Sequence, residues 1–334
     1  MTGIFDFRGF EAMYDEWEEG YRSGAGPGEF SYRRGGPTSL YGTTDMVFSR
    51  YILGRMPNEG DRDAWSAVIN GFQDSRTGWY RKRYTLHFRS HTAAYAVAAL
   101  TLLGRVPAYP VRETYRVSRD RRAVERWLAS VPWSLIWPGS HVVAGLPAIR
   151  LMTRTPDDGT AEFLERWRGW LDGRVHPETG FWSRGLLQKL GLRGTLTKEE
   201  MGGAFHMYFI YEAAGWPWPL PEKIVDATLE LQRDNGFWDA DVSYCIDLDG
   251  IYCLTRSSRN AGGYRAKDVE AACRRYLERA EATLNDRDFL FARYDNSHRL
   301  PGALAAVAEC ALFFPEMIRT ETPWRQSLDA ACFI

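Results

Sequence analysis

Residues 231–254 read LQRDNGFWDADVSYCIDLDGIYCL, and the character of the chain changes twice within them. The first residues complete an amphipathic pattern that begins at Pro221. A glycine and two aromatics interrupt that pattern, and an apolar run then starts around Asp247 and Asp249. Glycine permits the left-handed conformation in which many helices end. The stretch therefore predicts a surface helix, a turn and a buried helix. Two carboxylates stand at the start of the buried helix, although burying a carboxylate is unfavourable.

The buried part of this design recurs along the chain, as an internal repeat should. Each copy has a polar or glycine-rich head, a run of small, aliphatic and aromatic residues, and in most cases a closing proline. Apolar residues on nearly all sides of a helix indicate that it is buried on most sides. The predicted inner helices lie in segments 35–57, 90–107, 139–156, 201–219, 243–259 and 296–315.

Segments of a second type lie between these inner helices. They alternate charged and apolar residues at helical spacing, which is typical of one-sided surface helices. Alternating outer and inner helices predict an all-α fold, an (α/α)5–6 toroid with little strand, in one domain covering residues 1–334. The rival is an open helical solenoid, but the inner helices are too apolar to line an open concave face. The predicted outer helices lie in 57–74, 120–131, 158–173, 221–234 and 265–284.

The bulk composition bounds the possible partners. The chain has 334 residues, of which 45% are hydrophobic and 14% aromatic, so it can bury a large core. A net charge of −1 argues against nucleic acid or an anionic membrane as the main partner. There is no run of 18 apolar residues, no basic leader followed by an apolar run, and no CxxC pair among five cysteines. We expect a cytoplasmic protein with reduced thiols, without a membrane span, acting on a small molecule.

The turn Gln232…Gly236-Phe237-Trp238 resembles the Gln–Gly–x–Trp repeat of squalene and other terpene cyclases, and β-subunits of protein prenyltransferases carry similar turns. A looser copy stands at 73–79, and a copy without the glutamine stands at 180–182. The resemblance is closest over 221–315. It implies a helical toroid more strongly than it implies an activity, because a fold does not fix function.

Departures from both families restrict what the resemblance implies. Terpene cyclases of the second class use an Asp-x-Asp-Asp acid motif, and the last aspartate is replaced here by Gly250. The zinc-binding Asp-Gly-Cys-Tyr stretch of prenyltransferases has Ile251 in place of cysteine. The basic residues that hold a diphosphate before that aspartate are also missing. We therefore do not expect prenyl transfer from a diphosphate.

Histidines recur at one position of the repeat. Three of the six lie 15 to 17 residues before the closing proline of an inner segment, and a fourth lies about one turn deeper. In the first repeat Tyr41 takes this position, with Asp45 one turn deeper. A polar residue at a helix start can merely cap it, and a histidine can be a satisfied core residue. The recurrence nevertheless favours a functional cavity where the heads meet, formed around His91, His141, His206 and His298.

Imidazole and carboxylate are the usual general acid–base groups. An aspartate in an apolar cavity has a raised pKa and can remain protonated as an acid. We therefore expect an acid–base enzyme that cyclises, isomerises or hydrates an isoprenoid-like or other largely apolar molecule. The catalytic candidates are Asp249, Asp247, His298, His91, His141 and His206. The candidates for substrate binding are Tyr41, Asp45, Tyr95, Trp137, Trp238 and Tyr252.

Three alternatives remain open at this point. A carbohydrate-active toroid (glycoside hydrolase, lyase or epimerase) would show an open polar cleft, and a hydrolase needs two carboxyls about 5–5.5 or 6.5–9.5 Å apart. A non-catalytic scaffold would have its polar heads plugged by side chains. A zinc site could be assembled from histidines and aspartates, but no HxH or HExxH pair anchors one, so ligands would come from separate repeats. We expect no cofactor.

Overall fold

The computed structural model describes residues 3–83, 85–156, 158–182, 190, 192 and 196–334. Within these ranges the chain forms fourteen α-helices and one two-stranded sheet, so the predicted all-α class is confirmed. The sheet pairs β1 (Phe5–Asp6) in parallel with β2 (Ile318–Arg319), which joins two segments from opposite parts of the sequence. None of the helices in these ranges is long and apolar enough to cross a membrane.

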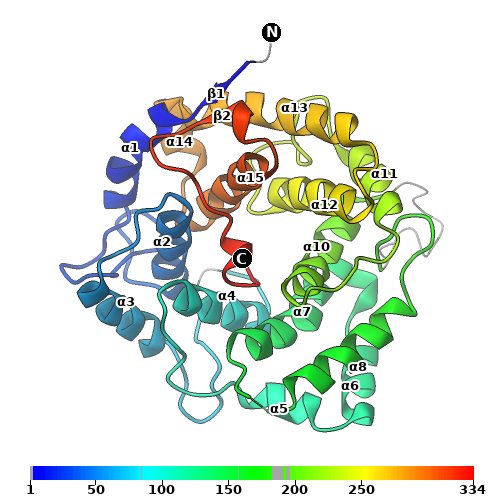
Figure 1. The fold of residues 1–334 in the computed structure, drawn as a ribbon. Helices are drawn as coiled ribbons and strands as arrows, with labels where there is room; N and C mark the ends of the chain where they lie inside the picture. The colour runs from blue at the N-terminus through cyan, green and yellow to red at the C-terminus, as the bar shows by residue number, and fades with distance from the viewer. Residues whose placement is uncertain (1–2, 84, 157, 183–189, 191, 193–195) are drawn as a thin grey trace.

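Six buried helices form an inner layer, and each of them overlaps one of the predicted inner segments. Each helix contacts the next along the chain, and the last contacts the first, so the contacts form a closed cycle (Figure 1). Close approach depends on small residues: a methyl group on Gly145 would lie 2.7 Å from the carbonyl oxygen of Ser90 on the neighbouring helix. The inner helices are α2 (Leu40–Ile52), α4 (Arg89–Leu102), α7 (Ile136–Met152), α10 (Lys198–Ala213), α12 (Ile246–Asn260) and α15 (Leu300–Phe313).

Outer helices surround this layer and bury only one face. In the first predicted outer segment, for example, Trp65 and Ile69 are buried while Glu59 and Asp63 are exposed. The predicted segments correspond to α3 (Glu59–Gly71), α6 (Arg121–Ala129), α8 (Thr160–Asp172), α11 (Pro221–Leu231) and α13 (Ala266–Leu284). Three further helices were not predicted: α1 (Arg8–Glu19), α5 (Arg112–Ser118) and α14 (Arg287–Arg293).

Several of the helices begin at side chains that satisfy free backbone N–H groups. The Ser39 hydroxyl accepts from the Gly42 N–H at the start of α2. At the start of α10, Thr197 and Glu200 form a capping box, each side chain accepting from the backbone of the other. These caps place the heads of the inner helices at defined residues, and the candidate site lies at those heads.

The glutamine of the repeated turn has a clear structural role. The Gln232 side-chain amide donates to the carbonyl oxygens of Gly236 and Ala272, each at 2.9 Å, and so ties the turn to α13. Gly236 has a φ of 86°, a left-handed conformation that suits glycine. The turn motif is therefore explained by backbone hydrogen bonding, without a catalytic role.

The looser copy of the turn makes the same contacts. The Gln73 amide donates to the carbonyl oxygens of Gly78, at 2.9 Å, and Tyr109, at 2.7 Å. Gly78 is also left-handed, with a φ of 78°. Equivalent bonding at two turns with different spacing supports reading them as copies of one structural unit.

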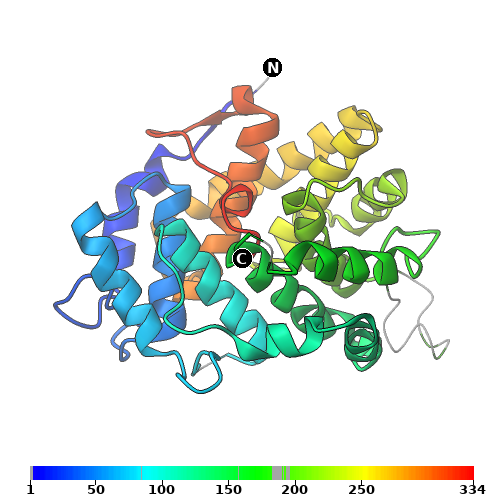
Figure 2. The ribbon, with the colours of Figure 1, turned by 60° about the horizontal axis from the view of Figure 1, so that its bottom comes forward.

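The last residues of the chain lie inside the closed cycle of inner helices. The one-turn helix η4 (Ser327–Asp329) contacts both α2 and α10, which belong to different parts of the inner layer. The end of the chain lies near the ring centre in both ribbon views (Figure 1, Figure 2). None of the predicted segments includes residues 320–334, so this placement is a finding of the structure.

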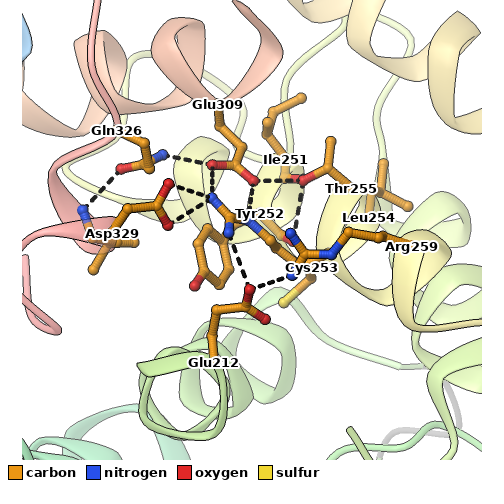
Figure 3. A network of polar contacts seen from close by, with 12 residues as sticks. Glu212, Ile251, Tyr252, Cys253, Leu254, Thr255, Arg259, Glu309, Gln326 and Asp329 are labelled. Carbon is orange, nitrogen blue, oxygen red and sulfur yellow. Dashed lines mark hydrogen bonds and ion pairs between the residues drawn. The ribbon is translucent and has the colours of Figure 1, made fainter. Parts of the chain in front are cut away.

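A buried polar network ties the tail to the inner helices (Figure 3). Arg256 on α12 donates to both oxygens of Glu309 on α15, at 2.6 and 2.9 Å, and is 3% exposed. Its guanidinium also lies 3.0 Å from a carboxylate oxygen of Asp329, while Gln326 donates to Glu309 at 2.8 Å. Burial alone would lower the pKa of Arg256, but the hydrogen bonds and charge of Glu309 outweigh it and raise that pKa.

Candidate functional site

A cavity of about 370 Å³ lies among the heads of the inner helices. Three of its lining residues, Leu86, Pro138 and Tyr244, are exposed and mark its mouth, whereas the histidines His91, His141 and His206 are buried. The wall combines apolar side chains with imidazoles. The lining residues are Leu86, His87, His91, Tyr95, Trp137, Pro138, His141, His206, Tyr244, Cys245, Leu248, His298, Pro301, Gly302 and Ile334.

Six of the twelve residues predicted for the site line this cavity. They are His91, His141, His206, His298, Tyr95 and Trp137. Two more lie directly behind the wall: the Tyr41 hydroxyl is 3.3 Å from His91 Nδ1, and Asp45 contacts His298. The repeat phase of the histidines therefore correctly placed their side chains around one space.

Three histidines form the deepest part of the cluster. The ring centroid of His91 lies 4.5 Å from that of His141 and 6.1 Å from that of His206, and the last two are 5.3 Å apart. His87 stacks on His91 at 4.1 Å and was not among the predicted site residues. His87 precedes His91 by four residues, about the spacing of one helical turn, and this spacing could have indicated that the two side chains lie together.

Burial keeps these imidazoles neutral at neutral pH. It lowers the pKa of His206 to about 4 and, with help from neighbouring cationic groups, that of His87 to about 2. The pKa values of His91 and His141 are likewise lowered well below the ordinary value, first by burial and then by the neighbouring histidines. A neutral imidazole keeps one nitrogen lone pair for accepting a proton, a hydrogen bond or a metal ion.

His298 is held by a buried carboxylate. Asp45 is fully buried, and its Oδ1 lies 2.8 Å from His298 Nδ1. The same oxygen accepts from the Tyr95 hydroxyl at 2.8 Å, and Oδ2 accepts from the Ser297 hydroxyl at 2.6 Å. A carboxylate only accepts hydrogen bonds, so His298 donates through Nδ1 and keeps Nε2 as its second functional nitrogen. The result is a histidine at the cavity wall with a fixed tautomer.

Asp247 does not line the main cavity. Its Oδ1 accepts from the Trp238 backbone N–H at 2.8 Å, and its Oδ2 accepts from the Ser243 hydroxyl at 2.9 Å. Burial raises the pKa of Asp247 to about 6, although the Trp238 N–H acts in the opposite direction. These contacts fasten the turn to the head of α12, so the geometry of Asp247 is that of a structural residue.

Asp249 is fully buried but also stands outside the cavity wall. Neither oxygen has a hydrogen-bond partner of normal geometry among the described residues, and the Cys245 thiol is close enough to act on its pKa. Burial, and then the charge of Asp247, raise the pKa of Asp249 well above its ordinary value. Gly202 leaves room for the group, since a methyl there would lie 2.8 Å from Asp249 Oδ2. The prediction of a protonated acid agrees with this direction, but its predicted position in the cavity does not.

Two predicted substrate-binding aromatics pack elsewhere. Trp238 fills the space over Gly250, where a methyl would lie 2.4 Å from its ring, and its indole N–H donates to the Thr228 carbonyl at 2.8 Å. Tyr252 packs against Phe205 and the Arg256 guanidinium. Trp238 lies in the turn before α12 and Tyr252 lies on α12, and neither lines the cavity. Cys245 and Leu248, from the same part of the chain, do line it.

The tail supplies residues that the sequence analysis missed. Ile334 lines the cavity, and the Phe333 ring meets His91 edge to face at a centroid distance of 4.9 Å. Ser140 was also missed, although its hydroxyl lies 3.0 Å from His206 Nδ1. Only the folded arrangement brings these side chains to the histidines.

Comparison with protein-family models, with curated proteins and with solved structures finds no match for this chain.

Proposed function

We propose that this protein is an enzyme that transfers a proton to or from a small, largely apolar molecule held in the central cavity. The observation that carries the proposal is the pairing of His298 with the fully buried Asp45 at the cavity wall. A cavity of about 370 Å³ is within the size range of small-molecule sites. The apolar part of its wall, formed by residues such as Leu248 and Pro301, favours a substrate with little polar surface.

In this proposal His298 is the general acid–base. Its Nε2 accepts a proton from the substrate and returns it to another atom, as in isomerisation, cyclisation or hydration. Asp45 fixes the imidazole through Nδ1 and stabilises the imidazolium that forms, while Tyr95 and Ser297 hold the carboxylate in place. The turns that resemble those of terpene cyclases are compatible with an isoprenoid-like substrate. Asp249 has no step in this scheme, because it does not reach the cavity.

The carbohydrate-active alternative is less well supported. A glycoside hydrolase needs two carboxyl side chains facing its substrate, and no Asp or Glu side chain is among the described residues that line this cavity. A non-catalytic scaffold, in which side chains would fill the space at the helix heads, is also less well supported, because a cavity remains beside the histidines. The five cysteines are free thiols, which is consistent with the cytoplasmic location that we include in the proposal.

A two-step experiment tests the proposal. Purified protein is screened by native mass spectrometry against small apolar alcohols, alkenes and ketones. Compounds that bind are then incubated with the protein in deuterated water, and the recovered compound is analysed for deuterium and for rearranged or hydrated product. Enzyme-dependent deuterium incorporation supports proton transfer. Compounds that displace one another from the cavity but gain neither deuterium nor a new structure would contradict it.

A further inference from the structure

Three buried imidazoles from three different inner helices converge at the base of the cavity. His91 comes from α4, His141 from α7 and His206 from α10, and one ring nitrogen of each lies within 4.8 Å of those of the other two. All three residues are buried, with exposures of 4%, 8% and 1%. Burying polar rings that lack full hydrogen bonding is unfavourable compared with apolar packing. A ligand bound by the three imidazoles would offset this unfavourable free energy of burial.

The spacing of the rings fits one shared metal ion. A zinc–nitrogen bond of about 2.0–2.1 Å and tetrahedral angles place the centroids of two liganding imidazoles about 5 Å apart. The observed separations are 4.5, 5.3 and 6.1 Å, so they scatter around this value.

In His91 and His206, one ring nitrogen is held in the way that is usual for liganding histidines. A second group commonly bonds the nitrogen that does not face the metal, and so fixes the orientation of the ring. The Ser140 hydroxyl lies 3.0 Å from His206 Nδ1, and the Tyr41 hydroxyl lies 3.3 Å from His91 Nδ1. Ser140 itself donates to the Trp137 carbonyl at 2.6 Å, so its oxygen is available to accept from His206. These contacts leave Nε2 of His91 and of His206 for a ligand.

His141 provides an independent observation. Its Nδ1 is buried and has no hydrogen-bond partner within the described part of the chain. An unpartnered nitrogen in a set of three converging imidazoles is the arrangement expected of a metal site.

We propose that His91, His141 and His206 bind one divalent transition-metal ion of the zinc type. Three neutral imidazoles suit zinc, cobalt, nickel or copper better than magnesium or calcium, which prefer oxygen ligands. Because all three histidines line the cavity, an ion bound by them would lie beside the space in which we place the substrate. There the ion would act as a Lewis acid on a substrate oxygen or bound water. The site does not rest on the proposed proton transfer, and its test needs no activity.

Direct metal binding tests the site. The full chain, with any polyhistidine tag removed, is stripped with a chelator and titrated with zinc in competition with a fluorescent zinc chelator. We expect one ion per chain with a Kd below about 1 µM. Cobalt bound in place of zinc should show the intense visible absorption of a four-coordinate site. Substituting any one ligand, as in His141→Gln, should weaken binding by at least about 100-fold.

Matched variants separate loss of a ligand from loss of the fold. His298→Gln changes another histidine of the same cavity, and His176→Gln changes one outside it, so both should bind zinc within about 3-fold of the parent. Ser140→Ala removes the partner of His206 Nδ1 without removing a ligand, and should weaken binding about 10-fold in a protein with parental circular dichroism. The site is wrong if the parent binds no zinc in this range, or if binding survives the loss of His91, His141 and His206 together.

Discussion

His298 Nδ1 lies 2.8 Å from Asp45 Oδ1, although the two residues are 253 positions apart in the sequence. His298 belongs to the short helix η2 (Ser297–Arg299) that leads into α15, and Asp45 lies on α2. The contact between α2 and α15 is the one that closes the cycle of inner helices. The proposed acid–base pair is therefore assembled across the point of closure and exists only in the completed fold.

Replacing Asp45 with asparagine should lower the rate of proton transfer by about 100-fold to 10,000-fold, which is the usual contribution of a positioned acid–base pair. Asparagine keeps the shape of the side chain but cannot stabilise the imidazolium form of His298. The measurement is kcat in the deuterium-incorporation assay, with circular dichroism as a check of folding. Parental turnover by Asp45→Asn would remove His298 and Asp45 from the mechanism.

Replacing Asp249 with asparagine distinguishes the catalytic role expected from the sequence motif from the non-catalytic role expected from the position of Asp249. The motif resemblance predicts a loss of activity by orders of magnitude. The position of Asp249 behind the wall, with its pKa raised well above the ordinary value, predicts kcat within a few-fold of the parent. Asparagine resembles a protonated aspartate in size and polarity, so the fold should persist. A loss of 100-fold or more in a folded variant would restore Asp249 as a catalytic residue.

Replacing Asp247 with asparagine should stabilise the protein at high pH. The pKa of Asp247 is raised in the folded state from 3.8 to about 6, so ionisation favours unfolding. The parent should lose stability relative to the variant as the pH rises from about 4 to about 6, and the difference should then stay constant at up to about 3 kcal/mol. Urea unfolding at pH 3.5, 5 and 8 measures it. A variant that is less stable than the parent at pH 8 would show that the charged form is favoured.

Substitutions in the buried network around Arg256 should lower the free energy of unfolding by unequal amounts. Replacing Arg256 with methionine leaves Glu309 buried without its cation and should destabilise the protein by about 3–5 kcal/mol. Adding Glu309→Leu removes the unpaired charge and should recover much of that loss. Asp329 is half exposed, so Asp329→Asn should change stability by less than about 1 kcal/mol. The free energy of unfolding in urea measures all three, and equal losses for Arg256→Met and Asp329→Asn would contradict this account.

Local sequence patterns predicted the helices well. Hydrophobic periodicity distinguishes a helix that is buried all round from one that is buried on one face, and it located the cores of six inner and five outer helices. The short helix α5 and the edge helices α1 and α14 were missed. The repeat phase also placed His91, His141, His206 and His298 around one cavity, because equivalent positions of packed repeats lie at the same level.

The choice of carboxylate could not be made from the sequence. Asp249 stood beside a recognisable motif, whereas Asp45 was a single acid in an apolar helix. Which of the two bonds to a histidine of the cavity wall depends on the rotation of α12 against α10 and on the contact between α2 and α15, and both are set by side-chain packing between distant segments. The same holds for Phe333 and Ile334, whose position depends on where the tail finds space within the ring.

The sequence by itself therefore determined the helical class, the alternation of inner and outer helices and the level at which the histidines lie, since periodicity and capping act over a few residues. Only the tertiary structure decided that His298 pairs with Asp45, that Asp247 fastens a turn and that Asp249 is buried behind the wall. The physical reason is that hydrogen-bond partners and burial depend on the rotation and closure of packed helices, which join residues hundreds of positions apart.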